Sequence, residues 1–132
     1  MKNTIILLTM LLFSGIGFAQ ESNNGKQLWA KSFLNEKAPE LTVETWISKK
    51  PDTEGKFVII DFWATWCGPC RKAIPELNEI AKEFSKDVVV IGISDEPVEK
   101  IKAMKEPVIE YYYGVDTKKT MDKILEIKGI PH

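Results

Sequence analysis

The sequence has few residues that could hold a metal ion. It contains two cysteines, Cys67 and Cys70, and a single histidine, His132, among 132 residues. A structural zinc site needs four ligands of these kinds. We therefore expect no metal, and no motif in the sequence indicates a cofactor.

An excess of positive charge is also lacking. The chain has 18 Lys and Arg against 19 Asp and Glu, a formal net charge of -1. Without a basic patch, a nucleic-acid partner is not expected. The length and the 44% hydrophobic content indicate one soluble globular domain.

The long apolar run, from Ile5 to Phe18, lies near the N-terminus, behind Lys2. It is interrupted by polar and small residues and is shorter than the roughly 20 residues that span a bilayer. Gly17 and Ala19 match the small-residue pattern of a cleavage site. We predict a signal peptide over residues 1–19, with an uncleaved anchor as the alternative. The mature protein would be periplasmic, where its cysteines meet an oxidising environment.

The remaining sequence predicts a short extension over residues 20–37 and an α/β domain over residues 38–132. Apolar runs at 57–63 and 87–93 are typical of buried strands, the first of them central and covered on both faces. Between them, apolar residues at spacings of three and four predict a helix that contains Pro75 and is kinked there. Together they form a parallel βαβ unit.

Shorter elements complete this pattern. Alternating residues around Leu41 and Val43 predict a strand, and residues 95–106 a short helix opened by Pro97. Residues 108–114, which include three tyrosines, predict another strand. A last helix is expected from a cap at Asp116 or Thr117 to Gly129.

The spacing of Cys67 and Cys70 favours redox chemistry. A disulfide that closes so small a loop removes little entropy from the unfolded chain, so it would be a poor structural staple. Cys67 falls where a buried strand gives way to a helix, and a helix N-terminus favours the thiolate. Cys70 lies one turn further and should be less exposed. We expect Cys67 to attack a partner disulfide and Cys70 to resolve the mixed disulfide.

Asp61 is the one charged residue of the strand "FVIIDFW". A buried carboxylate is costly unless it is neutral or hydrogen-bonded, so its pKa should be raised. The strand leads beneath the dithiol, and we predict that Asp61 is a general base and acid for Cys70. A carboxyl group satisfied by nearby backbone is the alternative.

The segment "VIIDFWATWCGPCRKAIPEL" resembles the active site of thioredoxin-fold thiol-disulfide oxidoreductases, and "APELTV" resembles their secreted TlpA/ResA-type branch. The resemblance covers about Ala38 to His132. It implies a thioredoxin-like fold and a substrate loop at "KGIPH", with Pro131 as its cis-proline, facing the dithiol, and Ile130 before it. We also expect Trp66, Gly68 and Pro69 to bind substrate beside the dithiol, because Gly68 lets another backbone approach closely and Trp66 can cover the site. For Trp66, a buried aromatic side chain is the alternative.

Three features depart from the pattern of this family. The strand "VVVIGI" lacks a lysine to pair with Asp61, so burial alone should tune that carboxyl group. Ala73 stands where relatives dedicated to cytochrome maturation carry glutamate. The family continues past the cis-proline loop into a β-hairpin and a closing helix, whereas this sequence ends at His132. We therefore expect a thioredoxin-like fold without those elements, with residues 20 to 132 alone poorly folded or aggregated.

The expected function is thiol-disulfide exchange with cysteine pairs of client proteins, by a monomer. The Gly-Pro dipeptide resembles that of reducing thioredoxins, whose reduction potential is about -270 mV. We therefore expect this protein to reduce clients, with electrons from a membrane thiol donor. A non-enzymatic binding module is the alternative. A peroxiredoxin-like peroxidase is less favoured, because no T-x-x-C arrangement surrounds Cys67.

Overall fold

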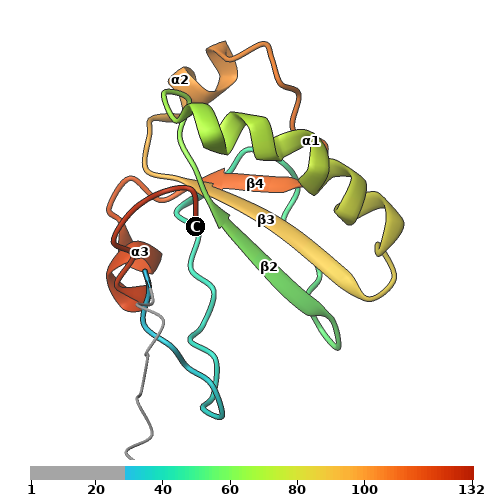
Figure 1. The fold of residues 1–132 in the computed structure, drawn as a ribbon, viewed down its shortest axis with the longest axis vertical. Coiled ribbons are helices and arrows are strands. Elements are labelled where there is room, and N and C mark those ends of the chain that lie inside the picture. The colour runs from blue at the N-terminus through green and yellow to red at the C-terminus, as the bar shows by residue number, and fades with distance from the viewer. Residues whose placement is uncertain (1–28) are drawn as a thin grey trace, which may run out of the picture.

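The computed structural model describes residues 29–132, so the predicted signal peptide and most of the extension lie outside the described residues. Figure 1 shows a twisted sheet with helices packed around it. The elements in chain order are β1 (Thr45–Trp46), β2 (Phe57–Phe62), α1 (Gly68–Glu83), β3 (Val88–Ser94), α2 (Val98–Ala103), β4 (Tyr112–Val115) and α3 (Thr120–Leu125).

The sheet has four strands in the order β1-β4-β3-β2. β2 and β3 run parallel, with Phe57 opposite Val88, and α1 connects them. β4 is parallel to β3, whereas β1 is antiparallel to β4. The predicted βαβ unit is confirmed, because its two apolar runs pair directly and the amphipathic helix between them packs on the sheet.

Two hydrophobic clusters lie on opposite faces of the sheet, because successive side chains of a strand point to opposite faces. Val90 of β3 belongs to the cluster with Ile74 of α1 and Ile101 of α2. Its neighbour Ile91 belongs to the cluster with Met121 of α3. β3 is therefore buried on both faces, between α1 and α2 on one side and α3 on the other.

The prediction that β2 is central and fully covered is wrong. Within residues 29–132, β2 pairs only with β3 and forms an edge. Phe57 is 77% exposed, whereas Phe62 at the other end is 5% exposed. A run of apolar residues predicts a strand, but it does not predict how many other strands pair with it. In β2 only the C-terminal end is buried.

The ends of two shorter elements also differ from the prediction. The first strand is a two-residue pair at Thr45–Trp46 instead of the segment around Leu41 and Val43. The last helix ends at Leu125 because Glu126 takes a left-handed conformation with φ of 51°, well before Gly129. Its N-terminus follows Lys119, but the predicted cap Asp116 does accept a bond from Met121 N at 2.8 Å.

Within residues 29–132, no helix has the length and apolar character needed to cross a membrane.

Candidate functional site

Cys67 and Cys70 form a disulfide where the loop after β2 enters α1. Cys67 is the N-cap residue, and its Sγ accepts a hydrogen bond from Cys70 N at 3.3 Å. Pro69, which has no N–H, lies in the first turn of the helix, where none is needed. The structure therefore places the first cysteine sulfur at the helix N-terminus, as the sequence predicted.

The disulfide is buried beneath an exposed loop. Cys67 is 4% exposed and Cys70 is fully buried, so the predicted order holds by a small margin. The residues around them are exposed: Gly68, Pro69 and Trp66, of which Trp66 is 69% exposed. A partner that reaches the disulfide must contact this rim, which contains three of the predicted substrate-binding residues.

Asp61 is buried, and its carboxylate Oδ2 accepts a hydrogen bond from the Tyr111 hydroxyl at 3.3 Å. Burial raises the pKa of Asp61 to about 6, and the bond from Tyr111 lowers it in part. Burial and the neighbouring Asp61 raise the pKa of Tyr111, so its hydroxyl remains a donor at neutral pH. The expectation that burial alone tunes Asp61 is therefore wrong.

Sequence reasoning missed Tyr111 because it treated the three tyrosines as strand residues. Gly92 of β3 lies opposite Asp61, and a side chain there would come within 3.0 Å of the Tyr111 ring and of Trp63 Nε1. The glycine thus leaves room for Tyr111 to reach across β3. A glycine within a buried strand, opposite a buried carboxyl group, was the available signal.

The segment after α3 returns to the disulfide region. The Ile130–Pro131 peptide bond is cis, and Ile130 packs against the cluster that contains Cys67 and Cys70. Phe62 N, at the end of β2, donates to His132 O at 2.8 Å. The structure thus places Ile130 beside the cysteine cluster, while Pro131 itself is exposed.

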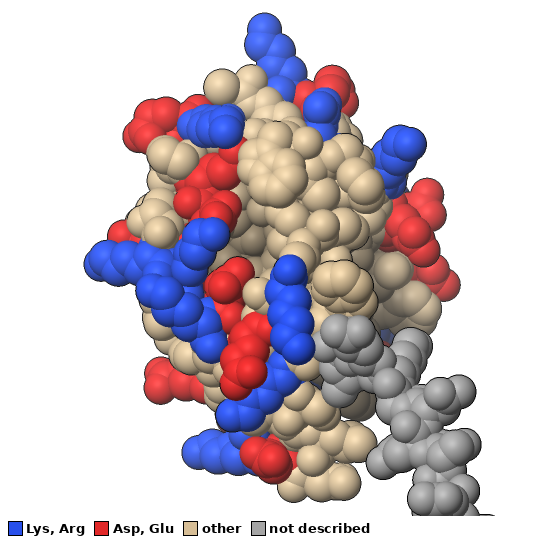
Figure 2. All heavy atoms as spheres, turned by 60° about the vertical axis from the view of Figure 1, so that its left-hand side comes forward, with Lys and Arg blue, Asp and Glu red and all other residues tan. Residues whose placement is uncertain are grey.

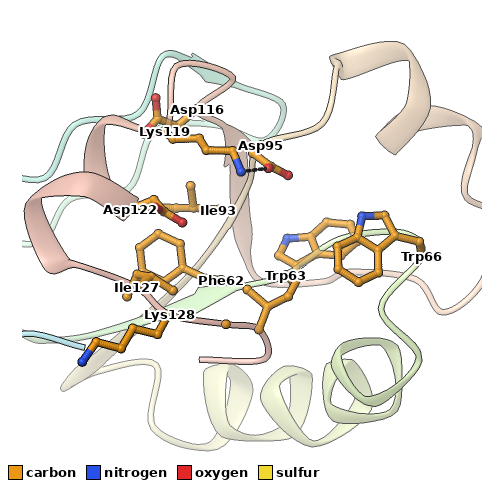
Figure 3. A pocket seen from close by; sticks show the side chains of 12 residues that line it. Phe62, Trp63, Trp66, Ile93, Asp95, Asp116, Lys119, Asp122, Ile127 and Lys128 are labelled. Atoms are coloured by element: carbon orange, nitrogen blue, oxygen red, sulfur yellow. Dashed lines mark ion pairs between the residues drawn. The ribbon is translucent and has the colours of Figure 1, made fainter. Parts of the chain in front are cut away.

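A cavity of about 460 Å³ adjoins this region. Its apolar part is formed by Phe62, Trp63, Ile93, Ile127 and Ile130, and Trp66 lies at one end (Figure 3). The ion pair between Lys119 and Asp95 also lines the cavity, with Lys119 Nζ 2.8 Å from Asp95 Oδ2. Two predicted substrate-binding residues, Trp66 and Ile130, therefore line one cavity.

The charges around the site are mixed in sign. On the face shown in Figure 2, basic and acidic side chains are interspersed around an uncharged area. Within the described part of the chain, no group of three or more His, Cys, Asp or Glu is placed to hold a metal ion. The arrangement is a buried disulfide with an exposed rim, an adjoining apolar cavity and a buried carboxyl group.

The AhpC/TSA family profile matches residues 34–131. The thioredoxin-like protein YneN of Bacillus subtilis is 34% identical over 68 residues, which cover 49% of this chain and 40% of that protein. A thioredoxin of Streptomyces clavuligerus is 36% identical over 69 residues, which cover 50% of this chain and 64% of that protein. The chain thus spans less than two thirds of each relative.

Two solved structures are similar in fold. A Chlorobium tepidum protein assigned as thiol:disulfide interchange protein DsbE superposes with a TM-score of 0.52 and 28% identity, over 58% of this chain and 56% of that one. The exposed lipoprotein thioredoxin Etrx1 of Streptococcus pneumoniae gives 0.51 and 28%, over 59% and 64%. These matches confirm the predicted thioredoxin-like α/β fold.

Proposed function

Because the chain belongs to the AhpC/TSA family and has a thioredoxin-like fold, we propose that it exchanges its Cys67–Cys70 pair with cysteine pairs of client proteins. The observation that carries this function is the disulfide at the N-terminus of α1, beneath the exposed rim of Trp66, Gly68 and Pro69. The cavity lined by Trp66 and Ile130 would bind the part of the client protein that carries its cysteines.

In the reducing direction, the Cys67 thiolate attacks one sulfur of a client disulfide. The client S–S bond breaks and releases one client thiolate, while Cys67 becomes joined to the client. The Cys70 thiolate then attacks the Cys67 sulfur, which releases the second client thiolate and restores the Cys67–Cys70 disulfide. Two electrons pass to the client, whose thiolates take up two protons.

Asp61 would take the proton from Cys70 in the second step. Its pKa of about 6 suits a base that is ionised at neutral pH yet can still exchange protons. Tyr111 would hold its carboxylate in place on the face of the sheet that carries the cysteine cluster.

We place this exchange in the periplasm, in the TlpA/ResA-type branch, with reduction of clients as the physiological direction. Support comes from the N-terminal apolar run and from the lipoprotein and DsbE assignments of the structural neighbours. The Gly-Pro dipeptide between the cysteines favours the reductant role, which requires a thiol electron donor at the membrane.

Insulin reduction tests this function. The chain should accelerate the reduction of insulin disulfides by dithiothreitol, and Cys67→Ser should abolish the acceleration. A non-enzymatic binding module would bind clients without accelerating their reduction. Consumption of hydrogen peroxide without insulin reduction would instead favour a peroxidase and contradict the proposal.

A further inference from the structure

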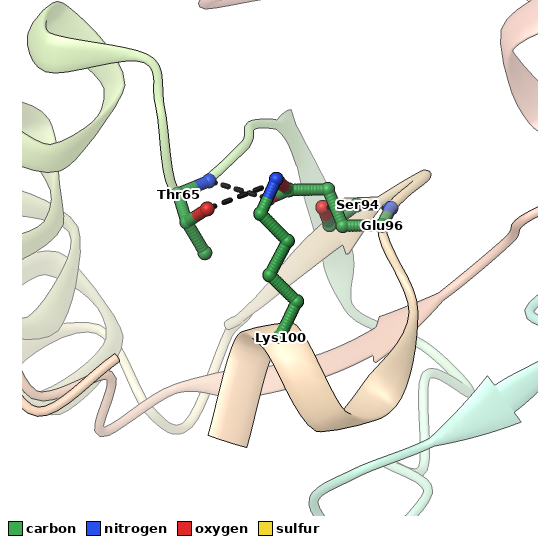
Figure 4. Close-up of polar contacts among 4 residues, drawn as sticks. All are labelled: Thr65, Ser94, Glu96 and Lys100. Carbon is green, nitrogen blue, oxygen red and sulfur yellow. Dashed lines mark hydrogen bonds and ion pairs between the residues drawn. The ribbon is translucent and has the colours of Figure 1, made fainter. Parts of the chain in front are cut away.

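A buried carboxylate holds the loop immediately before Cys67. Glu96 follows β3 and is 6% exposed. Its Oε2 accepts the backbone N–H of Thr65 at 2.6 Å, and its Oε1 accepts the Thr65 hydroxyl at 2.9 Å. Figure 4 shows the carboxylate facing both donors. These bonds join the loop after β2 to the loop after β3.

The charge of Glu96 is balanced locally. Lys100 Nζ, one turn further along the chain, lies 2.6 Å from Glu96 Oε1. Burial raises the pKa of Glu96, but the hydrogen bonds from Lys100 and Thr65 outweigh this and hold the pKa below its ordinary value. Glu96 is therefore ionised at neutral pH, and the two bonds to Thr65 are of the stronger, charge-assisted kind.

Thr65 precedes Cys67 by two residues, and Cys67 N donates to Ala64 O at 3.1 Å. In the oxidised protein the bond to Cys70 fixes the Cys67 sulfur covalently. Reduction removes that link. The sulfur then stays near the Cys70 amide only if the loop keeps its shape, so the anchor at Thr65 matters most in the reduced state.

We propose that Glu96 is a positioning residue for the exchange reaction: by holding Thr65 it keeps the reduced Cys67 thiol at the N-terminus of α1, where the helix amides favour the thiolate. The inference rests on the proposed function, since it concerns the same thiol. Glu96 itself need not touch the client, because it acts through Thr65.

The test measures how fast iodoacetamide alkylates Cys67 as a function of pH. The full chain is used in a Cys70→Ser background, so that one thiol reacts. Thr65→Val removes the hydroxyl donor and keeps the Glu96 charge. It should move the alkylation midpoint up by about one pH unit and slow the reaction by up to about tenfold at pH values well below the midpoint, with the same plateau at high pH. Thr65→Ser should restore the wild-type profile.

Glu96→Gln should move the midpoint in the same direction as Thr65→Val, because it also weakens the anchor. Glu99→Gln is the matched control: it makes the same chemical change at an exposed position of α2 and should change nothing. Thermal melting of every variant reports whether it folds. If Thr65→Val does not fold, Glu96→Gln still tests the proposal, because its side chain keeps one acceptor oxygen.

Two results would overturn the proposal. If Thr65→Val and Glu96→Gln lower the melting temperature but leave the alkylation profile unchanged, the contact is only structural. If Glu96→Gln lowers the midpoint while Thr65→Val has no effect, Glu96 acts through its charge. Neither depends on insulin reduction, so a chain that fails to reduce insulin would contradict the proposed function separately.

Discussion

Cys67 and Cys70 are three residues apart, yet their surroundings differ. The Cys67 sulfur accepts a hydrogen bond from the Cys70 amide, and Cys67 lies next to exposed Trp66 and Gly68. Cys70 is fully buried inside the first turn of α1. Under the proposed function, a client disulfide would therefore react with the Cys67 sulfur first, and Cys70 would act after a mixed disulfide has formed beside it.

We therefore predict that Cys70→Ser traps mixed disulfides with clients and that Cys67→Ser does not. Trapping is measured by non-reducing electrophoresis after incubation with a disulfide-containing client, with release by dithiothreitol as the control. Equal trapping by both variants would contradict the assignment of nucleophile and resolving cysteine, and trapping by Cys67→Ser alone would reverse it.

Asp61→Asn should separate the catalytic from the structural role of this carboxyl group. Wild-type insulin reduction should rise with a midpoint near pH 6, where Asp61 ionises, and the variant should lack this rise and react roughly a hundredfold more slowly at pH 7. An unchanged profile would leave Asp61 with a structural role only.

The same substitution should stabilise the fold at neutral pH. The pKa of Asp61 rises from 3.8 to about 6 in the folded state, so the folded protein binds this proton more tightly and loses stability as the pH rises from about 4 to about 6. A shift of about two units corresponds to about 3 kcal/mol at pH 7, an upper value for the gain on substitution. Urea denaturation at pH 4 and pH 7 measures it. A gain of the same size at pH 4 would argue against the ionisation effect.

Tyr111→Phe should change the pKa of Asp61, because it removes the hydroxyl that donates to the Asp61 carboxylate. In the wild-type protein the hydrogen bond from Tyr111 favours the ionised carboxylate of Asp61. Its removal should therefore raise the pKa of Asp61 further above about 6, and the midpoint of the activity profile should rise with it. Tyr112→Phe, at the next position, is the control. A midpoint that stays in place would show that the contact does not tune the site.

Among the secondary-structure elements, the pair of β1 and β4 depends on a close approach at Gly114. A side-chain carbon there would lie 2.6 Å from both Thr45 O and Val43 Cγ1. Gly114→Ala should lower the free energy of unfolding by about 1–3 kcal/mol, because backbone must move to relieve the contact. Gly129→Ala, where the nearest atom is 3.9 Å away, is the control. Similar urea midpoints for both variants would contradict this packing.

The elements β2, α1 and β3 show what could be predicted from the sequence. β2, α1 and β3 were located from apolar runs and helical spacing, and the position of Cys67 at the helix start followed from the change of period between them. The contacts of Asp61 with Tyr111 and of Glu96 with Thr65 join residues 50 and 31 positions apart. Such pairs depend on strand order and on the room above Gly92, which local periodicity does not encode.

Across the whole molecule, burial is uneven over the sheet. β3 is covered on both faces, but β2 has one paired edge within residues 29–132, with Phe57, Val58 and Ile59 respectively 77%, 39% and 38% exposed. On the outer edge of β2 the described residues place one backbone bond, from Phe62 N to His132 O. An apolar strand edge with free amide and carbonyl groups can pair with another chain.

We therefore predict that the chain associates as its concentration rises. Light scattering over a micromolar to near-millimolar range should show growing particle mass, and Phe57→Lys combined with Val58→Lys should reduce it, because charge at the edge opposes strand pairing. Val108→Lys, at a site that is 56% exposed and whose carbonyl accepts a hydrogen bond from Asn78 of α1, is the control for added charge and should not reduce association. Insulin reduction by the double variant should be retained, since both positions lie at the end of β2 opposite to the loop that leads to Cys67. A monomer of constant mass with cooperative melting over the whole range would contradict this prediction and would instead agree with the monomer expected from the sequence.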